Sequence, residues 1–128
     1  MIYLDTSVAL AQLFAEDRQP PAALWGETLV SSRLLEYELR TRVNARGLAR
    51  THDEHVRGLL GRIAFIELAR PVLERALEPF AKPVRTLDAL HLASMDFLRQ
   101  QGQRLQLASY DLRLIDAAKH MKIAVFPL

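Results

Sequence analysis

Short apolar runs alternate with longer amphipathic segments along the whole chain. The runs are rich in aliphatic residues and short enough to be buried strands, and they cover residues 1–5, 28–32, 63–68, 105–109 and 123–126. The segments between them place apolar residues three and four positions apart, as one face of a helix does. Strands that alternate with helices predict an α/β fold with a central, mainly parallel sheet of about five strands.

Hydroxyl, proline and glycine residues mark where the intervening helices begin and end. We expect helices over about residues 6–15, 33–45, 52–62, 71–81, 86–101 and 111–120, with a short one at 22–26. Thr6 or Ser7 is suited to cap the first helix, and Thr51 the helix that runs to about residue 62, because a short side-chain oxygen can accept from the unpaired N–H groups there. No repeat or linker divides the chain, so residues 1–128 are expected to form a single domain.

The composition narrows the class of protein. Half of the 128 residues are hydrophobic and a quarter are charged, which is typical of a folded domain. The lack of cysteine excludes disulfides and thiolate metal sites. The first strand begins at Met1 and no apolar run approaches transmembrane length, so we expect a cytoplasmic protein with no signal peptide and no membrane partner.

The net charge of +2 is small, but the positive charge is unevenly distributed. Residues 39–52 hold Arg40, Arg42, Arg46 and Arg50 and no acid. Guanidinium groups can bind phosphates through their charge and their forked geometry. A solvated helix face is the simpler explanation of such a run, so charge alone does not identify a nucleic-acid binder.

Four acids stand out by their positions. Asp5, Asp88 and Asp111 lie at or near strand-to-helix junctions, and Glu38 lies within the helix that follows the second strand. In a parallel sheet these junctions share one edge, where open α/β folds build their sites. Four carboxylates gathered there repel one another unless a hard cation such as Mg²⁺ holds them together. The pattern therefore predicts a magnesium site.

Each of these acids also has a structural alternative. Asp5 and Asp111 can be plain helix N-caps. Helical geometry places Glu38 on a core-facing arc, where an acid needs a partner, and Arg42 stands at the i,i+4 position for a salt bridge. Asp88 falls in a first turn, where the helix dipole favours an anion.

Other polar residues near the acids have supporting or structural interpretations. His91, one turn from the acid at 88, is best explained as a hydrogen-bonded structural histidine. Asp96 is explained by Arg99 and solvent. Asp116 has surface partners three and four residues on, and we interpret it as an outer or structural acid. Ser109 can orient the following acid or a metal-bound water.

Four segments together resemble the PIN domain, and specifically the VapC-type toxins of bacterial toxin–antitoxin pairs. They are residues 2–7 (IYLDTS), 30–40 (VSSRLLEYELR), 86–93 (TLDALHLA) and 108–114 (ASYDLRL). Any one of them would be a weak signal, since an apolar run that ends in aspartate is common. All four occur in the order and spacing of the family and cover essentially the whole chain.

The resemblance implies a three-layer α/β/α sandwich and an endoribonuclease that depends on Mg²⁺, with Mn²⁺ as a substitute. The positions that match the family's catalytic, metal-binding acids are Asp5, Glu38, Asp88 and Asp111, and the hydroxyls near such a site are Thr6, Ser7 and Ser109. Many relatives carry further acids after the fourth position, where Leu112 and Arg113 stand here. Asp116 is the next acid, so the identity of the last ligand and the number of metal ions stay open.

The resemblance also implies partners. These are an RNA substrate, a second copy of the chain in a homodimer, and a small VapB-type antitoxin whose C-terminal segment blocks the site. The candidate side chains for holding RNA phosphates are Arg40, Arg42, Arg46, Arg85 and Arg113.

Two other classes compete with a nuclease. One is a non-catalytic PIN-like module that binds RNA or a protein without cutting. Unused converging acids would destabilise a fold through repulsion, which argues against it. The other is a phosphate-handling protein with one Mg²⁺ and Asp5 as acceptor, but Ser7 stands where its second aspartate is expected. We therefore predict a nuclease.

Overall fold

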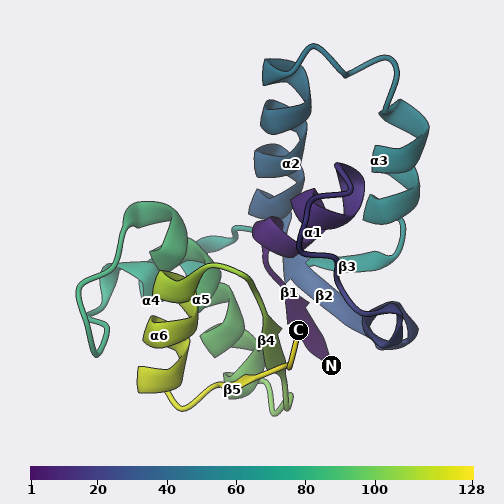
Figure 1. Ribbon diagram of the computed structural model, residues 1–128. Coiled ribbons are helices and arrows are strands. Elements are labelled where there is room, and N and C mark those ends of the chain that lie inside the picture. The colour runs from purple at the N-terminus through teal and green to yellow at the C-terminus, as the bar shows by residue number, and fades with distance from the viewer.

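The central sheet has five strands, all parallel, as the alternation of runs predicts. A computed structural model describes all of residues 1–128. The strands are β1 (Ile2–Leu4), β2 (Leu29–Ser32), β3 (Ile63–Ile66), β4 (Gln106–Ala108) and β5 (Ala124–Val125). Their order is β3-β2-β1-β4-β5, and every neighbouring pair is parallel (Figure 1).

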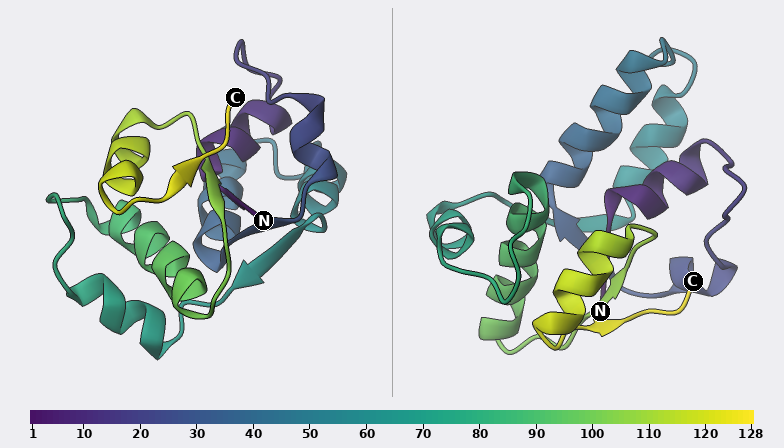
Figure 2. Two further views of the ribbon diagram at one scale, coloured as in Figure 1. Left: turned by 90° about the horizontal axis from the view of Figure 1, so that it is seen from below. Right: turned by 60° about the vertical axis from the view of Figure 1, so that its left-hand side comes forward.

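Helices cover both faces of the sheet. They are α1 (Thr6–Leu13), α2 (Arg33–Ala45), α3 (Asp53–Leu60), α4 (Arg70–Leu77), α5 (Thr86–Gln100) and α6 (Leu112–His120), with a 3₁₀ turn η1 (Ala22–Gly26). Helices α1, α2 and α3 lie on one side, and α5 and α6 lie on the other with α4 packed along α5 (Figure 2). The three-layer α/β/α sandwich is confirmed. No helix combines the length and the apolar character needed to cross a membrane.

The alternation of side chains along β1 divides the core in two. Ile2 and Leu4 are buried among the side chains of α1, α2 and α3. Tyr3 points to the opposite face, where it is buried with Leu92 of α5 and Leu107 of β4. Because successive residues of a strand face opposite sides, a three-residue strand is enough to join both layers. Each such burial contributes about 1.5–3 kcal/mol.

Several helix boundaries and caps differ from the prediction. Asp5, and not Thr6 or Ser7, caps α1, since its carboxylate accepts from the backbone N–H of Ser7. Thr51 caps nothing, because its hydroxyl donates back to the carbonyl of Leu48. Helix α1 stops two residues early, before a left-handed Ala15 with φ 48°.

Other elements also end early for identifiable reasons. Helix α4 ends at Leu77 instead of about residue 81, because Glu78 precedes Pro79 and takes an extended conformation. Strand β3 ends at Ile66, where β2 turns into α2 and leaves no neighbour to pair with. Helix α3 ends at Leu60, with Gly61 as its C-cap residue, instead of about residue 62.

The sheet order places a crevice beside β1. The chain moves outward from β1 through β2 to β3, and later returns to add β4 and β5 on the other side. The carboxyl ends of β1 and β4 therefore diverge into helices on opposite faces, which is where open α/β sheets bind ligands. Asp5 follows β1 and Ser109 follows β4 at this point.

Candidate active site

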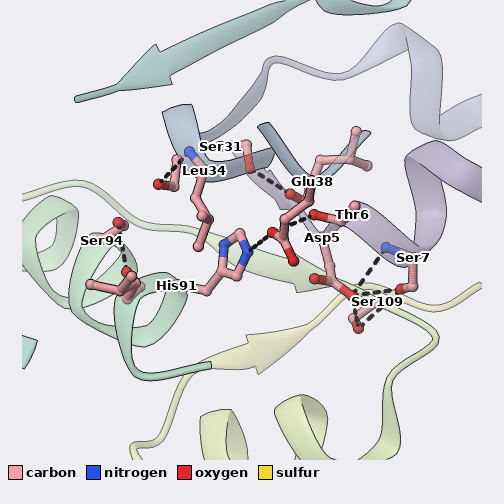
Figure 3. A network of polar contacts seen from close by, with 12 residues as sticks. Asp5, Thr6, Ser7, Ser31, Leu34, Glu38, His91, Ser94 and Ser109 are labelled. Atoms are coloured by element: carbon pink, nitrogen blue, oxygen red, sulfur yellow. Dashed lines mark hydrogen bonds and ion pairs between the residues drawn. The ribbon is translucent and has the colours of Figure 1, made fainter. Parts of the chain in front are cut away.

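Asp5 is held rigidly at the end of β1. It is 6% exposed, and its Oδ2 accepts from the Ser7 hydroxyl at 2.6 Å and the Ser109 hydroxyl at 2.8 Å (Figure 3). Ser109 Oγ also accepts from the backbone N–H of Asp111 at 2.9 Å. All these groups lie close to the ends of β1 and β4. Both hydroxyls hold the same oxygen of Asp5, and Ser109 also links Asp5 to Asp111.

Glu38 comes to the same edge from α2. Its Oε1 accepts from the Thr6 hydroxyl at 2.9 Å and lies 2.7 Å from Nε2 of His91 (Figure 3). The predicted alternative, an ion pair with Arg42, does not form. His91 is hydrogen-bonded and buried, as expected of a structural histidine, but it also contacts one of the acids directly.

Asp88 and Asp111 complete the group. Burial raises the pKa of Asp88, and the nearby charges of Asp111 and Asp5 raise it further. Like charges that are not paired with a cation disfavour the ionised form of a carboxyl in this way. Asp88 and Asp111 also line one groove. Asp111 is also an N-cap, since its Oδ1 accepts from the backbone N–H of Arg113 and Leu114 at 3.0 and 3.3 Å.

Three of the four acids open onto a groove of about 850 Å³, whereas Asp5 does not line it. Glu38, Asp88 and Asp111 line it. Of the five candidate arginines, those that line the same groove are Arg42, Arg85 and Arg113. The other two point elsewhere: Arg40 pairs with Glu36 at 3.9 Å, and the guanidinium of Arg46 lies 4.0 Å from the centre of the Phe14 ring.

With this geometry in place, the comparison with known proteins is decisive. Residues 2–120 match the PIN domain. The chain belongs to the PIN domain family. It is 30% identical to "Ribonuclease VapC47" of Mycobacterium tuberculosis (strain CDC 1551 / Oshkosh), over 94% of this chain and 92% of the relative. A chain of a solved structure titled "Toxin-antitoxin complex from Klebsiella pneumoniae" has the same fold, with a TM-score of 0.73, 17% identity, and coverage of 100% of this chain and 98% of that one.

The acids of this PIN domain suit a divalent cation in their chemistry, although they do not form a closed coordination shell. No three His, Asp or Glu side chains are grouped as they stand so that they could hold a metal ion. Carboxylate oxygens are nevertheless the donors that Mg²⁺ prefers. Burial, and after it the charges of Asp111 and Asp5, raise the pKa of Asp88, and a bound cation would favour its ionised form.

Asp116 does not line the groove that holds Glu38, Asp88 and Asp111 in this PIN domain. Its carboxylate pairs with Lys82 at 2.5 Å and with His120 at 3.6 Å. The expected partner Lys119 forms no ion pair with it, because Lys82, which is 34 residues away in sequence, occupies the carboxylate. Asp116 lines a neighbouring pocket of about 470 Å³ that also includes Asp88. Hydrogen bonding to Lys82 lowers the pKa of Asp116.

Two residues that matter to this PIN domain were not singled out from the sequence. Tyr3 was assigned only to a buried strand, yet its hydroxyl lies 2.7 Å from Nδ1 of His91. A tyrosine inside an otherwise aliphatic strand is a usable signal, because a buried hydroxyl needs a partner. Arg75 was also missed: it binds Asp96 at 2.6 Å, so Arg99 and solvent do not fully explain that acid.

Proposed function

We propose that this PIN domain is a metal-dependent endoribonuclease, the toxin of a VapBC-type toxin–antitoxin pair. The observation that carries the proposal is a groove in which Glu38, Asp88 and Asp111, from three separate segments, lie together with three arginines. The similarity to a curated ribonuclease over nearly the whole chain supports the RNA substrate. Such a toxin would act in the cytoplasm, where its substrate is.

Asp5 and Asp88 are the main ligands that we assign to Mg²⁺, or to Mn²⁺ in its place. Glu38 and Asp111 act as further ligands or orient the attacking water. When bound, the cation supplies positive charge against the developing phosphoryl charge and makes water easier to deprotonate. The chain contributes fixed carboxylates: Asp5 is held by two serine hydroxyls, and Glu38 by Thr6 and His91.

Arg42, Arg85 and Arg113 are the side chains that we assign to the RNA backbone. They line the groove that also contains the acids, and a guanidinium can bind two phosphate oxygens at once. Phosphate contacts of this kind hold the strand in place without selecting its sequence. Arg40 and Arg46 become weaker candidates, because each is engaged outside the groove.

We further propose a VapB-type antitoxin and a homodimer as partners. The solved structure with the same fold is titled as a toxin–antitoxin complex, which supports a protein inhibitor for this chain. The groove beside the acids is the place where such an inhibitor would stop cleavage. RNA and antitoxin would then compete for one surface.

The test is an assay of total RNA with purified protein free of antitoxin. Cleavage is measured with Mg²⁺, with Mn²⁺ and with EDTA, for the wild type and for Asp88→Asn. Asp53→Asn on α3 is the matched control, since that acid pairs only with exposed Arg57. We expect discrete products that require metal, persist in the control and disappear in Asp88→Asn.

A different result would favour the non-catalytic module. Folded wild-type protein that binds Mn²⁺ and RNA but leaves total RNA intact would support binding without cleavage. Cleavage that is equal in EDTA and in Mg²⁺ would contradict the metal site. Cleavage that persists in Asp88→Asn would remove that acid from the mechanism.

A further inference from the structure

A continuous line of buried hydrogen bonds leads from the core to Glu38. The backbone N–H of Ser32 donates to the Tyr3 hydroxyl at 3.2 Å, and that hydroxyl lies 2.7 Å from Nδ1 of His91. Nε2 of His91 lies 2.7 Å from Oε1 of Glu38, which also accepts from Thr6 (Figure 3). Tyr3 is fully buried and His91 is 2% exposed, so the line is shielded from water.

The chemistry of the partners decides which nitrogen of His91 carries the proton. An ionised Glu38 can only accept, so Nε2 of the neutral ring must be the donor toward it. Nδ1 is then the acceptor, and the Tyr3 hydroxyl donates to it while its oxygen accepts from Ser32. Every donor in the line has an acceptor. From the Tyr3 hydroxyl onward, each group donates its hydrogen bond to the next group toward Glu38.

The bond between His91 and Glu38 also joins two layers of the fold. Glu38 lies on α2, which packs on one face of the sheet, and His91 lies on α5, which packs on the other. Asp88 is one turn before His91 on the same helix. The bond therefore ties the helix that carries one acid to the helix that carries another.

We propose that His91 is a positioning residue for Glu38, and that Tyr3 orients the ring of His91 for this task. The proposal rests on the proposed nuclease function, in which Glu38 is a ligand or orients water. His91 and Thr6 both hold Oε1, which leaves Oε2 outside these two bonds and fixes the carboxylate at the groove. Partners of this kind, behind a group that acts directly, typically contribute 10–100-fold in metal affinity or activity.

Two substitutions of His91 test whether its ring positions the Glu38 carboxylate or only fills space in the core. In His91→Asn the short amide occupies the place of Nδ1, so it retains the contact with Tyr3 but does not reach Glu38. In His91→Gln the longer amide brings an N–H close to the place of Nε2. We expect kcat to fall by about 10–100-fold in His91→Asn with KM for RNA little changed, and to be largely restored in His91→Gln.

A double-mutant cycle with Glu38 makes the test specific. In a Glu38→Gln background, His91→Asn should cost nothing further, because its effect acts through the carboxylate. Thermal melting of each variant shows whether it is folded before it is assayed, and His55→Gln on the exposed side of α3 is the control histidine. Equal losses in His91→Asn and His91→Gln, or losses that add to Glu38→Gln, would overturn the proposal.

Two readouts do not depend on nuclease activity. ¹⁵N NMR of the His91 ring should show a protonated Nε2 and an acceptor Nδ1, with the Nδ1 signal shifted in Tyr3→Phe. The opposite tautomer would overturn the proposal. If the wild type cuts no RNA, the nuclease proposal fails, but Mn²⁺ titration still tests positioning: His91→Asn should weaken Mn²⁺ binding about 10–100-fold, and an unchanged affinity would contradict it.

Discussion

Asp88 and Asp96 stand about two turns apart on helix α5, and their surroundings are opposite. Asp96 binds Arg75 at 2.6 Å and Arg99 at 2.8 Å. Burial alone would raise its pKa, but the hydrogen bonds from these two guanidinium groups outweigh burial and lower it. Asp88 has no such ion pair, and burial together with the charges of Asp111 and Asp5 raises its pKa.

The difference separates an acid that the fold pairs with arginines from one that we propose to be functional. The Arg75 side chain reaches from α4 to Asp96 and stacks 4.5 Å over the ring of Phe80, so this pair attaches α4 to α5. Asp88 has the favourable dipole of the helix start, but the charges of Asp111 and Asp5 act against its ionised form. A charge that the fold leaves uncompensated is a mark of a functional site, where a ligand completes the balance.

The largest expected effect is on RNA cleavage, which should depend on Asp88 and not on Asp96. Asp88→Asn should lower kcat for RNA cleavage by about 10²–10³-fold or more, the range for losing one group that stabilises developing charge. Asp96→Asn should leave kcat per folded molecule nearly unchanged, because Asp96 faces α4 and not the groove. Single-turnover cleavage of an RNA identified in the total-RNA assay, well below the melting temperature of both variants, measures this. Equal losses would erase the distinction.

The second prediction concerns stability, where Asp96→Asn should have the larger effect of the two substitutions. Asp96→Asn should lower the free energy of unfolding by about 2–4 kcal/mol, since it leaves Arg75, which is only 17% exposed, without its partner. Urea denaturation at pH 7 gives this value. Because the pKa of Asp96 is lowered in the fold, the contribution is present above pH 3.8 and is lost as the pH falls through the folded pKa. A loss that does not shrink in acid would contradict the ion pair as its source.

The third prediction concerns the divalent cation that we propose as a ligand of Asp88. Mn²⁺ at about 100 times its dissociation constant should stabilise the wild type by about 2.7 kcal/mol through mass action. Asp88→Asn should remove most of this gain, whereas Asp96→Asn should retain it. Thermal melting with and without Mn²⁺, with Ca²⁺-free buffer and an EDTA control, tests both. Stabilisation of equal size in Asp88→Asn would show that the cation binds elsewhere.

The same contrast shows what sequence could and could not predict. Hydrophobic periodicity located every strand and helix, because burial on a sheet or a helix face leaves a period of two or 3.6. Asp5 and Asp111 could be placed together, since they follow β1 and β4 and the strand ends of a parallel sheet share an edge. Asp88 was expected at such a junction too, but α5 follows α4 and not a strand, so the place of Asp88 in the groove depends on how α5 packs on the sheet. Partners distant in sequence could not be predicted: Arg75 lies 21 residues from Asp96, and Tyr3 lies 88 from His91.

The helix caps and the directions of side chains also could not be predicted from the hydrophobic periodicity. The sequence offered Asp5 either as a cap or as a metal ligand, and in the structure it is the cap of α1 while its charge also raises the pKa of Asp88. The hydrogen bonds from Ser7 and Ser109 all go to Oδ2 of Asp5, and none of them uses Oδ1. The two interpretations were therefore not exclusive, and periodicity alone does not reveal this.

The smallest expected effect is a gain in stability on removing the charge of Asp88. Below pH 3.8 the carboxyl is protonated in both folded and unfolded chains, so Asp88→Asn and wild type should unfold alike. As the pH rises through the raised folded pKa, the metal-free wild type loses stability and the variant does not. Solvent screens a half-exposed group, so the difference should stay below about 1 kcal/mol. With saturating Mn²⁺ the sign of this difference in the free energy of unfolding should reverse, because the same charge that destabilises the metal-free site then binds the cation. A difference that is independent of both pH and metal would mean that Asp88 is a structural acid like Asp96.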